Sequence, residues 1–231
     1  MCNRYAFIAD LAMLDVLSRL GVFSGAEFEP RYNLAPTSLA PVVRPTPHGN
    51  RLEVMRWGLL PAWKRSDPKA AGFTNARSES LTEKPSFRNA FKSRRCIVPA
   101  SGFFEWKTEG KNKLPHYFYR KDEKPLLFAG IYEPWSMPDS KAAGTFAIIT
   151  TAPNELIAPI HDRMPVILPW EIAPLWIDPA EENLEKMQSL LQPLPAELMA
   201  MYPVSMEVNS SRAQGHQLIQ PVISTGLPFV N

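Results

Sequence analysis

Prolines are spread along the whole chain and restrict what it can fold into. There are 24 of them among 231 residues. Because proline lacks a backbone N–H and fixes one backbone angle, it shortens helices and is rare in central strands. Together with 11 glycines, the prolines predict many short elements joined by ordered loops. No repeat, low-complexity stretch or linker divides the sequence, so we expect one domain over residues 1–231, with a C-terminal tail from about residue 224.

Between the prolines, segments rich in β-branched and aromatic residues predict strands. These segments are 53–60, 95–106, 116–120, 125–135, 144–152 and 163–169. Polar turns, such as KTEGKNKLP at 107–115, favour antiparallel hairpins. We expect a helix over 10–20, capped by Asp10 and stopped by Gly21, and a loop at RYNLAP, 31–36. Further short helices are expected at 86–92, 154–158, 170–176 and 181–191. Because helices and strands do not alternate regularly, the pattern predicts an α+β fold with a largely antiparallel, barrel-like sheet flanked by short helices.

Charge and cysteine content say little about partners but more about the compartment. The 25 basic and 23 acidic residues leave a net charge of +2, which neither requires nor excludes a nucleic acid partner. Two cysteines, Cys2 and Cys96, cannot form a disulfide framework, which favours a reducing compartment. No apolar run approaches the 18 or so residues of a membrane span, and no signal-peptide pattern is present. We therefore predict a cytoplasmic protein without a membrane partner.

Metal and cofactor sites are not expected. No histidine is paired with a cysteine or with a second histidine at ligand spacing, and no glycine-rich phosphate loop occurs. The histidines are His48, His116, His161 and His216.

Two segments contain candidates for proton transfer. His161 stands in IHDRMP, just before a predicted strand, although a single loop histidine is more often structural than catalytic. Glu105 stands in SGFFEW, where a carboxyl among aromatic side chains must be paired, hydrogen-bonded or raised in pKa. Period-two alternation puts Phe103 and Glu105 on one face of the strand and Phe104 on the other. A solvent-facing or salt-bridged glutamate is the alternative.

Polar and aromatic residues elsewhere suit nucleic acid but also have ordinary structural explanations. Asn75, Arg77 and Glu79 alternate in FTNARSES, so an extended segment would present all three on one face. Arg77 could bind a phosphate, or the three could form the wet side of a sheet. Trp63, in LLPAWK, could stack on a base or pack as a lid on the core. The basic stretch FKSRRC, 91–96, is typical of a solvated face.

Short motifs along the chain resemble those of one protein family. The motifs are MCNRY at 1–5, RYNLAP at 31–36, WGLLPAW at 57–63, NARSE at 75–79, RCIVPASGFFEW at 95–106, TTAPN at 150–154, IHDRMPVIL at 160–168 and LIQPV at 218–222. In this order they resemble the SRAP family, the SOS response-associated peptidases that shield abasic sites. One departure is Asn3, where the family usually has glycine.

The resemblance implies a protein with the SRAP fold that crosslinks to single-stranded DNA containing an abasic site. By residue-to-residue match, Cys2 corresponds to the nucleophile of the family. The other matched residues are Asn75, Glu105 and His161 for the active site, and Arg4 and Arg77 for the DNA backbone, with Trp63 in the segment that packs beside the DNA. A monomer associated with DNA and without cofactor is expected.

The position of Cys2 explains why a cysteine is suited to this chemistry. If Met1 is removed, Cys2 has a free α-amine, whose reference pKa is about 8, well below that of lysine. The amine can form a Schiff base with the abasic-site aldehyde, and the neighbouring thiol can then close a thiazolidine ring. His161 would act on the sugar ring oxygen, Glu105 would shuttle protons, and Asn75 would position the chain terminus. Two alternatives stay open: a thiol (auto)peptidase using Cys2, His161 and Asn75, and a non-covalent reader of single-stranded DNA.

Overall fold

The computed structural model describes residues 2–22, 28–64, 72–135 and 141–222, and strands dominate these ranges. The strands are β1 (Tyr5–Phe7), β2 (Arg31–Leu34), β3 (Leu39–Thr46), β4 (Gly49–Trp57), β5 (Asn75–Arg77), β6 (Arg95–Ala100), β7 (Gly102–Glu109), β8 (Asn112–Arg120), β9 (Leu126–Pro134), β10 (Gly144–Thr151), β11 (Met164–Pro165) and β12 (Met199–Pro203). The helices are α1 (Leu11–Arg19), α2 (Pro85–Ser93), α3 (Ala173–Ile177) and α4 (Leu184–Ser189). The expected tail from residue 224 lies outside the described residues.

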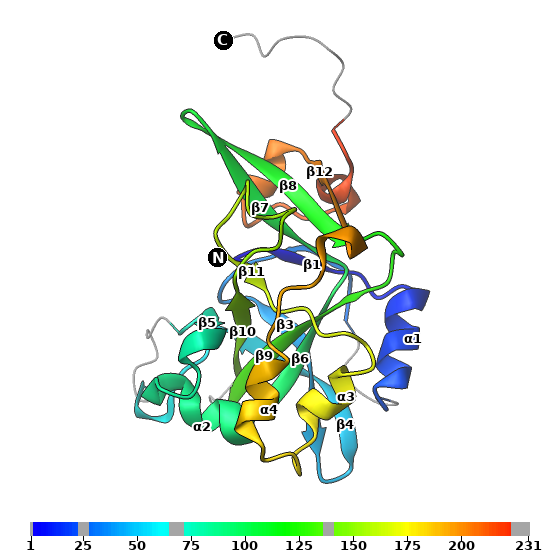
Figure 1. Ribbon diagram of the computed structural model, residues 1–231. Coiled ribbons are helices and arrows are strands. Elements are labelled where there is room, and N and C mark those ends of the chain that lie inside the picture. Colours follow the sequence, from blue (N-terminus) through cyan, green and yellow to red (C-terminus); the bar gives the residue numbers. More distant parts are fainter. Residues whose placement is uncertain (1, 23–27, 65–71, 136–140, 223–231) are drawn as a thin grey trace.

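Five strands close into a barrel in the lower half of Figure 1. They follow the order β4-β3-β6-β9-β10, and β10 pairs with β4 again. An odd number of strands cannot alternate in direction all the way around, so one neighbouring pair must run parallel. That pair is β4–β10, through Thr145 opposite Arg56 and Phe146 opposite Trp57. The α+β prediction of a largely antiparallel, barrel-like sheet is therefore confirmed.

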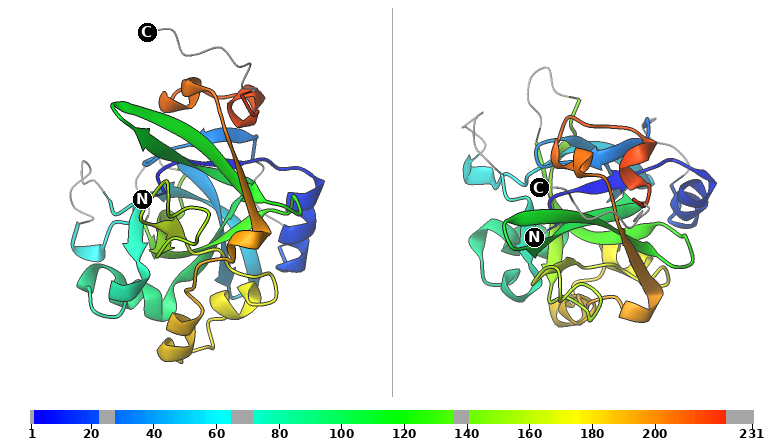
Figure 2. Two further views of the ribbon diagram at one scale, coloured as in Figure 1. Left: turned by 45° about the horizontal axis from the view of Figure 1, so that its top comes forward. Right: turned by 90° about the horizontal axis from the view of Figure 1, so that it is seen from above.

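A second sheet lies against one end of the barrel, with the strand order β12-β8-β7-β1-β2. Tyr5 of β1 packs into the barrel, with its ring centroid 5.2 Å from that of Trp57 and 5.9 Å from that of Phe128. The other face of this sheet buries Phe104 and Tyr117 against Val208 and further residues of the C-terminal segment. Figure 2 shows this segment, in orange and red, covering the sheet on the side away from the barrel. β1 is thus enclosed on both faces.

The predicted single strand over 95–106 is wrong, because the chain bends at Ser101 and its two halves join different sheets. β6 pairs with β9 in the barrel, whereas β7 pairs with β8 and β1. The Ser101 hydroxyl accepts a hydrogen bond from the Ile8 amide, at 2.9 Å, which holds the bend against β1. A Cβ at Gly102 would lie 2.3 Å from the Tyr117 ring, so this close crossing requires glycine.

One strand of the barrel accommodates two prolines, although prolines are rare in central strands. β3 lies outside the predicted strand segments and contains Pro41 and Pro45. β3 pairs along its whole length with β4, but it pairs with β6 only through Val43 and Ile97. The missing N–H groups of the two prolines therefore interrupt no hydrogen-bond ladder on the β6 side. RYNLAP is also not simply a loop, since β2 covers Arg31–Leu34 and pairs with β1.

The helix predictions are mostly confirmed, with shifted ends. Asp10 caps α1 by accepting a hydrogen bond from the Met13 amide, and Gly21 follows with a φ of 72°. α2, α3 and α4 overlap the segments expected at 86–92, 170–176 and 181–191. The segment 154–158 forms turns rather than a helix.

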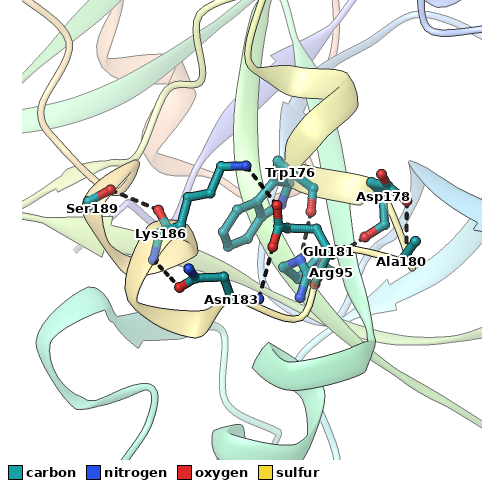
Figure 3. A network of polar contacts seen from close by, with 8 residues as sticks. All are labelled: Arg95, Trp176, Asp178, Ala180, Glu181, Asn183, Lys186 and Ser189. Carbon is teal, nitrogen blue, oxygen red and sulfur yellow. Dashed lines mark hydrogen bonds and ion pairs between the residues drawn. The ribbon is translucent and has the colours of Figure 1, made fainter.

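The basic stretch 91–96 is not simply a solvated face, because Arg95 is 4% exposed. Its guanidinium donates hydrogen bonds to the carbonyls of Trp176, Asp178 and Glu181, at 2.7 to 2.9 Å (Figure 3). Two more of its hydrogen bonds reach carbonyls in the last turn of α2. Lys186 of α4 in turn pairs with the Glu181 carboxylate at 2.7 Å. Arg95 therefore ties α2 and α3 to the segment that precedes α4.

Candidate active site

Cys2 lies immediately before β1 and is wholly buried. The Phe104 amide donates to the Arg4 carbonyl at 3.0 Å, so the start of the chain is held against β7. The Cys2 Sγ lies 3.9 Å from the same Arg4 carbonyl. Burial, and after it the nearby carboxylate of Glu105, raise the pKa of the Cys2 thiol far above its usual value. At neutral pH this group is therefore a thiol and not a thiolate.

Asn75 contacts Cys2 directly. It begins β5, which runs beside β10 and pairs Asn75 with Ile148. The Asn75 Nδ2 donates to the Cys2 carbonyl at 3.0 Å. Its Oδ1 is buried and has no hydrogen-bond partner among the described residues. A segment far along the chain thus positions the second residue and leaves a hydrogen-bond acceptor unused beside it.

Glu105 is a buried carboxyl of β7 and is only 3% exposed. The predicted alternation is confirmed, since Phe103 packs in the main core and Phe104 in the cluster on the other side of the sheet. Burial raises the pKa of Glu105 to about 7. Its Oε1 has no hydrogen-bond partner within the described ranges. A carboxyl half protonated at neutral pH can both donate and accept a proton.

His161 lies in a turn before β11, with its side chain 25% exposed. Burial lowers the pKa of His161 below its usual value, so the ring is mainly neutral at pH 7. In that state Nδ1 accepts a hydrogen bond from the Arg163 amide at 3.0 Å, which places the ring proton on Nε2. The Asp162 carboxylate, 3.0 Å from Nδ1, would stabilise the ring once it is protonated.

An open pocket of about 530 Å³ brings these groups together. Asn3, Arg4, Glu105 and His161 all line it. The remaining lining residues are Trp106, Thr108, Lys113, Ile160 and Asn209. Cys2 lies directly behind the pocket wall, joined in sequence to Asn3 and through a hydrogen bond to Asn75. The four residues predicted for the active site therefore lie close together, although they come from distant segments of the chain. They are Cys2, Asn75, Glu105 and His161.

Arg4 faces this pocket but is also held by the protein itself. Its guanidinium donates to Asn33 Oδ1 at 2.8 Å and to the carbonyls of Val208 and Asn209 at 2.7 and 3.1 Å. It lies 5.9 Å from the centre of the Trp106 ring. Asn33 is a residue that the sequence analysis missed, although it stands in the RYNLAP motif. It is 1% exposed and anchors the C-terminal segment beside the pocket.

Trp63 and Arg77 do not line this pocket. Trp63 lies in a 3-10 helix, Ala62–Lys64, and is 62% exposed, so it is not a lid packed on the core. The Lys64 ammonium lies 5.2 Å from the centre of its ring. Arg77 is exposed at the end of β5, two residues after Asn75. Both side chains are accessible to a partner that extends beyond the pocket.

Glu79 does not share a face with Asn75 and Arg77, because β5 ends at Arg77 and a 3-10 helix, Ser78–Ser80, follows. Its carboxylate instead accepts two hydrogen bonds from Arg163, at 2.7 and 2.9 Å. Arg163 also donates to the Thr150 carbonyl at 2.6 Å. This fork ties the His161 turn to the end of β5. Nothing local in the sequence links residues 79 and 163, so this ion pair could not be predicted from it.

No group of three or more His, Cys, Asp or Glu side chains within the described ranges is arranged to hold a metal ion. In the same part of the chain, no helix has the length and apolar character needed to cross a membrane.

A sequence model of the SOS response associated peptidase (SRAP) family matches residues 1–211. The chain belongs to the SRAP family. It is 39% identical to the abasic site processing protein YoqW of Bacillus subtilis, over 95% of this chain and 99% of that protein. It is 34% identical to the abasic site processing protein HMCES of Gallus gallus, over 87% of this chain and 68% of that one. A crystal structure of a protein from Bacteroides thetaiotaomicron has the same fold, with a TM-score of 0.82 and 32% identity over 96% of this SRAP chain and 100% of that chain.

Proposed function

We propose that this protein processes abasic sites in single-stranded DNA by forming a covalent thiazolidine link through Cys2. The observation on which the proposal rests is the hydrogen bond from Asn75 to the Cys2 carbonyl, which holds position 2 behind a pocket lined by Glu105 and His161. The names of the relatives as abasic site processing proteins agree with this chemistry. One chain contains every group required, so we propose a monomer associated with DNA.

The covalent step starts from the α-amine that removal of Met1 would leave on Cys2. The amine attacks the C1′ aldehyde, a C–N bond forms, and loss of one water gives a Schiff base. The thiol then adds to the same carbon, so that a C–S bond forms while the thiol proton passes to the imine nitrogen. The product is a thiazolidine, and its mass is that of protein plus DNA minus one water. The high pKa of the Cys2 thiol favours attack by the amine before addition of the thiol, because a neutral thiol is a poor nucleophile.

Proton transfer is assigned to the two ionisable groups of the pocket. Glu105, with a pKa of about 7, protonates the departing hydroxyl and accepts the proton of the attacking amine. The neutral His161 donates a hydrogen bond from Nε2 to the sugar ring oxygen as the ring opens. The same Schiff base permits strand cleavage by β-elimination, which ring closure by the thiol suppresses. Weak lyase activity is therefore expected before the ring closes.

DNA binding is assigned to cations and one aromatic side chain around the pocket. Arg77 is exposed and contacts a phosphate, while Trp63 stacks on a neighbouring base. Arg4 adds positive charge to the pocket wall while its hydrogen bonds keep the guanidinium in place. Affinity should therefore fall as salt concentration rises.

A peptidase acting on Met1 through Cys2, His161 and Asn75 is less well supported. In a thiol peptidase the orienting amide binds the imidazole and the thiol is activated as a thiolate. Here Asn75 binds the Cys2 carbonyl, and burial keeps the Cys2 proton in place.

Intact mass measurement with an oligonucleotide that contains one abasic site tests the proposal. Protein that has lost Met1 should gain the mass of the DNA minus one water, and the adduct should survive heating without reductant. The Cys2→Ala variant keeps an α-amine but no thiol, so its imine should be seen only after borohydride reduction. An oligonucleotide without the abasic site should give no adduct. A processed protein that forms no adduct would disprove the crosslinking function.

A further inference from the structure

Asn3 contacts Asn75 on the side facing the pocket. The Asn75 Nδ2 lies 3.2 Å from the Asn3 Oδ1 and 3.2 Å from the Thr74 hydroxyl oxygen, in addition to its 3.0 Å bond to the Cys2 carbonyl. The Thr74 hydroxyl also donates to the Asn3 Oδ1, at 3.5 Å. Asn3 itself lines the pocket that contains Glu105. Its side chain therefore links β5 to the start of the chain at the edge of the site.

These contacts determine which way round the Asn75 amide sits. Only the amide nitrogen can donate to the two oxygens of Cys2 and Asn3, so the amide oxygen must point elsewhere. A flipped Asn75 would lose these hydrogen bonds and the one that Nδ2 donates to the Thr74 hydroxyl oxygen, and it would bring its Oδ1 against the oxygens of Cys2 and Asn3. In the observed orientation, Oδ1 is buried and unpartnered within the described residues. A buried acceptor without a partner is costly, which suggests that a donor occupies this place during the reaction.

We infer that Asn3 is a positioning residue that locks the Asn75 amide, so that its Oδ1 can accept a hydrogen bond from the Cys2 amine. This inference rests on the proposed function. With one N–H bound by Oδ1, the amine lone pair is oriented for attack on the aldehyde. Among the described residues, the Asn3 side chain makes its hydrogen bonds with Thr74 and Asn75 and not with Cys2, Glu105 or His161. A side chain at this position therefore contributes to the reaction through its neighbour.

A double-mutant cycle separates this role from a direct one. The variants are Asn3→Ala, Asn75→Ala and their combination, each checked by intact mass for loss of Met1. The φ of Asn3 lies outside the left-handed region, so alanine introduces no backbone strain. The matched control is Asn50→Ala, which removes one hydrogen bond, to the Leu20 carbonyl, away from this pocket. The measurements are the rate constant of adduct formation at saturating abasic oligonucleotide and the dissociation constant for that DNA.

Asn3→Ala should slow adduct formation about fivefold, the size expected for one hydrogen bond, with the dissociation constant unchanged within about twofold. In the Asn75→Ala background, the same substitution should have almost no further effect. The pH at which the rate is half-maximal should stay the same, because the acid–base groups are intact. Asn50→Ala should react like the wild type.

An equal loss in both backgrounds would overturn the inference, because Asn3 would then act independently of Asn75. A shifted pH profile would also overturn it, since Asn3 would be acting by altering the Glu105 environment. A wild-type rate for Asn3→Ala would also overturn the inference, because the Asn75 amide would then be oriented without Asn3. Each of these outcomes requires a wild-type adduct. A wild-type protein that forms none would instead refute the proposed function, and the inference with it.

Discussion

Replacing Glu105 with glutamine should make the protein more stable at alkaline pH while impairing its chemistry. In the folded protein the pKa of Glu105 is raised from about 4.5 to about 7 by burial. At about 1.4 kcal/mol for each tenfold change in the proton equilibrium, ionising the buried carboxyl costs about 3 kcal/mol of folding free energy. A buried glutamine keeps part of the polar cost, so we expect Glu105→Gln to gain about 2 kcal/mol.

The stability of the wild-type protein depends on pH because the folded and unfolded states bind the Glu105 proton over different pH ranges. Above about pH 4.5 the unfolded chain releases the Glu105 proton, whereas the folded protein keeps it until about pH 7. Wild-type stability therefore falls as the pH rises from about 4.5 to 7, and the loss is complete above that window. The advantage of the glutamine variant should be small at pH 5 and full at pH 8.5.

Thermal unfolding of both proteins at pH 5 and pH 8.5 measures this difference. For a chain of 231 residues, about 2 kcal/mol corresponds to a rise in Tm of about 5 °C at pH 8.5. The control is Glu109→Gln on the same strand, where the carboxylate is exposed and paired with Lys107. It should show no gain at pH 8.5. A Glu105→Gln advantage that is the same at both pH values, or a loss at both, would refute the buried-carboxyl argument.

Three further substitutions test other parts of the structure. Trp63→Ala should weaken binding of a single-stranded oligonucleotide about tenfold in fluorescence anisotropy and leave the adduct yield at saturation unchanged; an unchanged affinity would exclude stacking by this residue. Arg77→Ala should reduce the slope of log affinity against log salt by about 0.7, and an unaltered slope would mean that Arg77 contacts no phosphate. Asn33→Ala should lower the free energy of unfolding by about 2 kcal/mol in urea, because it removes the hydrogen bonds to Arg4 and to the C-terminal segment; a change below about 0.5 kcal/mol would contradict its anchoring role.

Local signals predicted local structure well. The Asp10 cap and Gly21 stop identified α1, and the aromatic alternation around Glu105 identified the two faces of β7. The predictions were wrong or incomplete where the pairing between distant strands decides the secondary structure. β3 is a strand despite Pro41 and Pro45 because its partner on one side scarcely pairs with it. The bend at Ser101 could not be predicted from the sequence, because the residues on both sides of it favour strands.

By itself, the sequence determined the chemical inventory of the site: a cysteine at position 2 and the motifs that include Asn75, Glu105 and His161. Tertiary structure decided what these groups can do. The pKa of Glu105 near 7 depends on burial, which comes from packing by distant strands. Likewise, the Asn75 amide is held by hydrogen bonds to Cys2 and Asn3, and the His161 turn is held by the ion pair between Arg163 and Glu79. Residue type is local information, but the loss of water around a side chain and the identity of its neighbours arise only when the chain closes on itself.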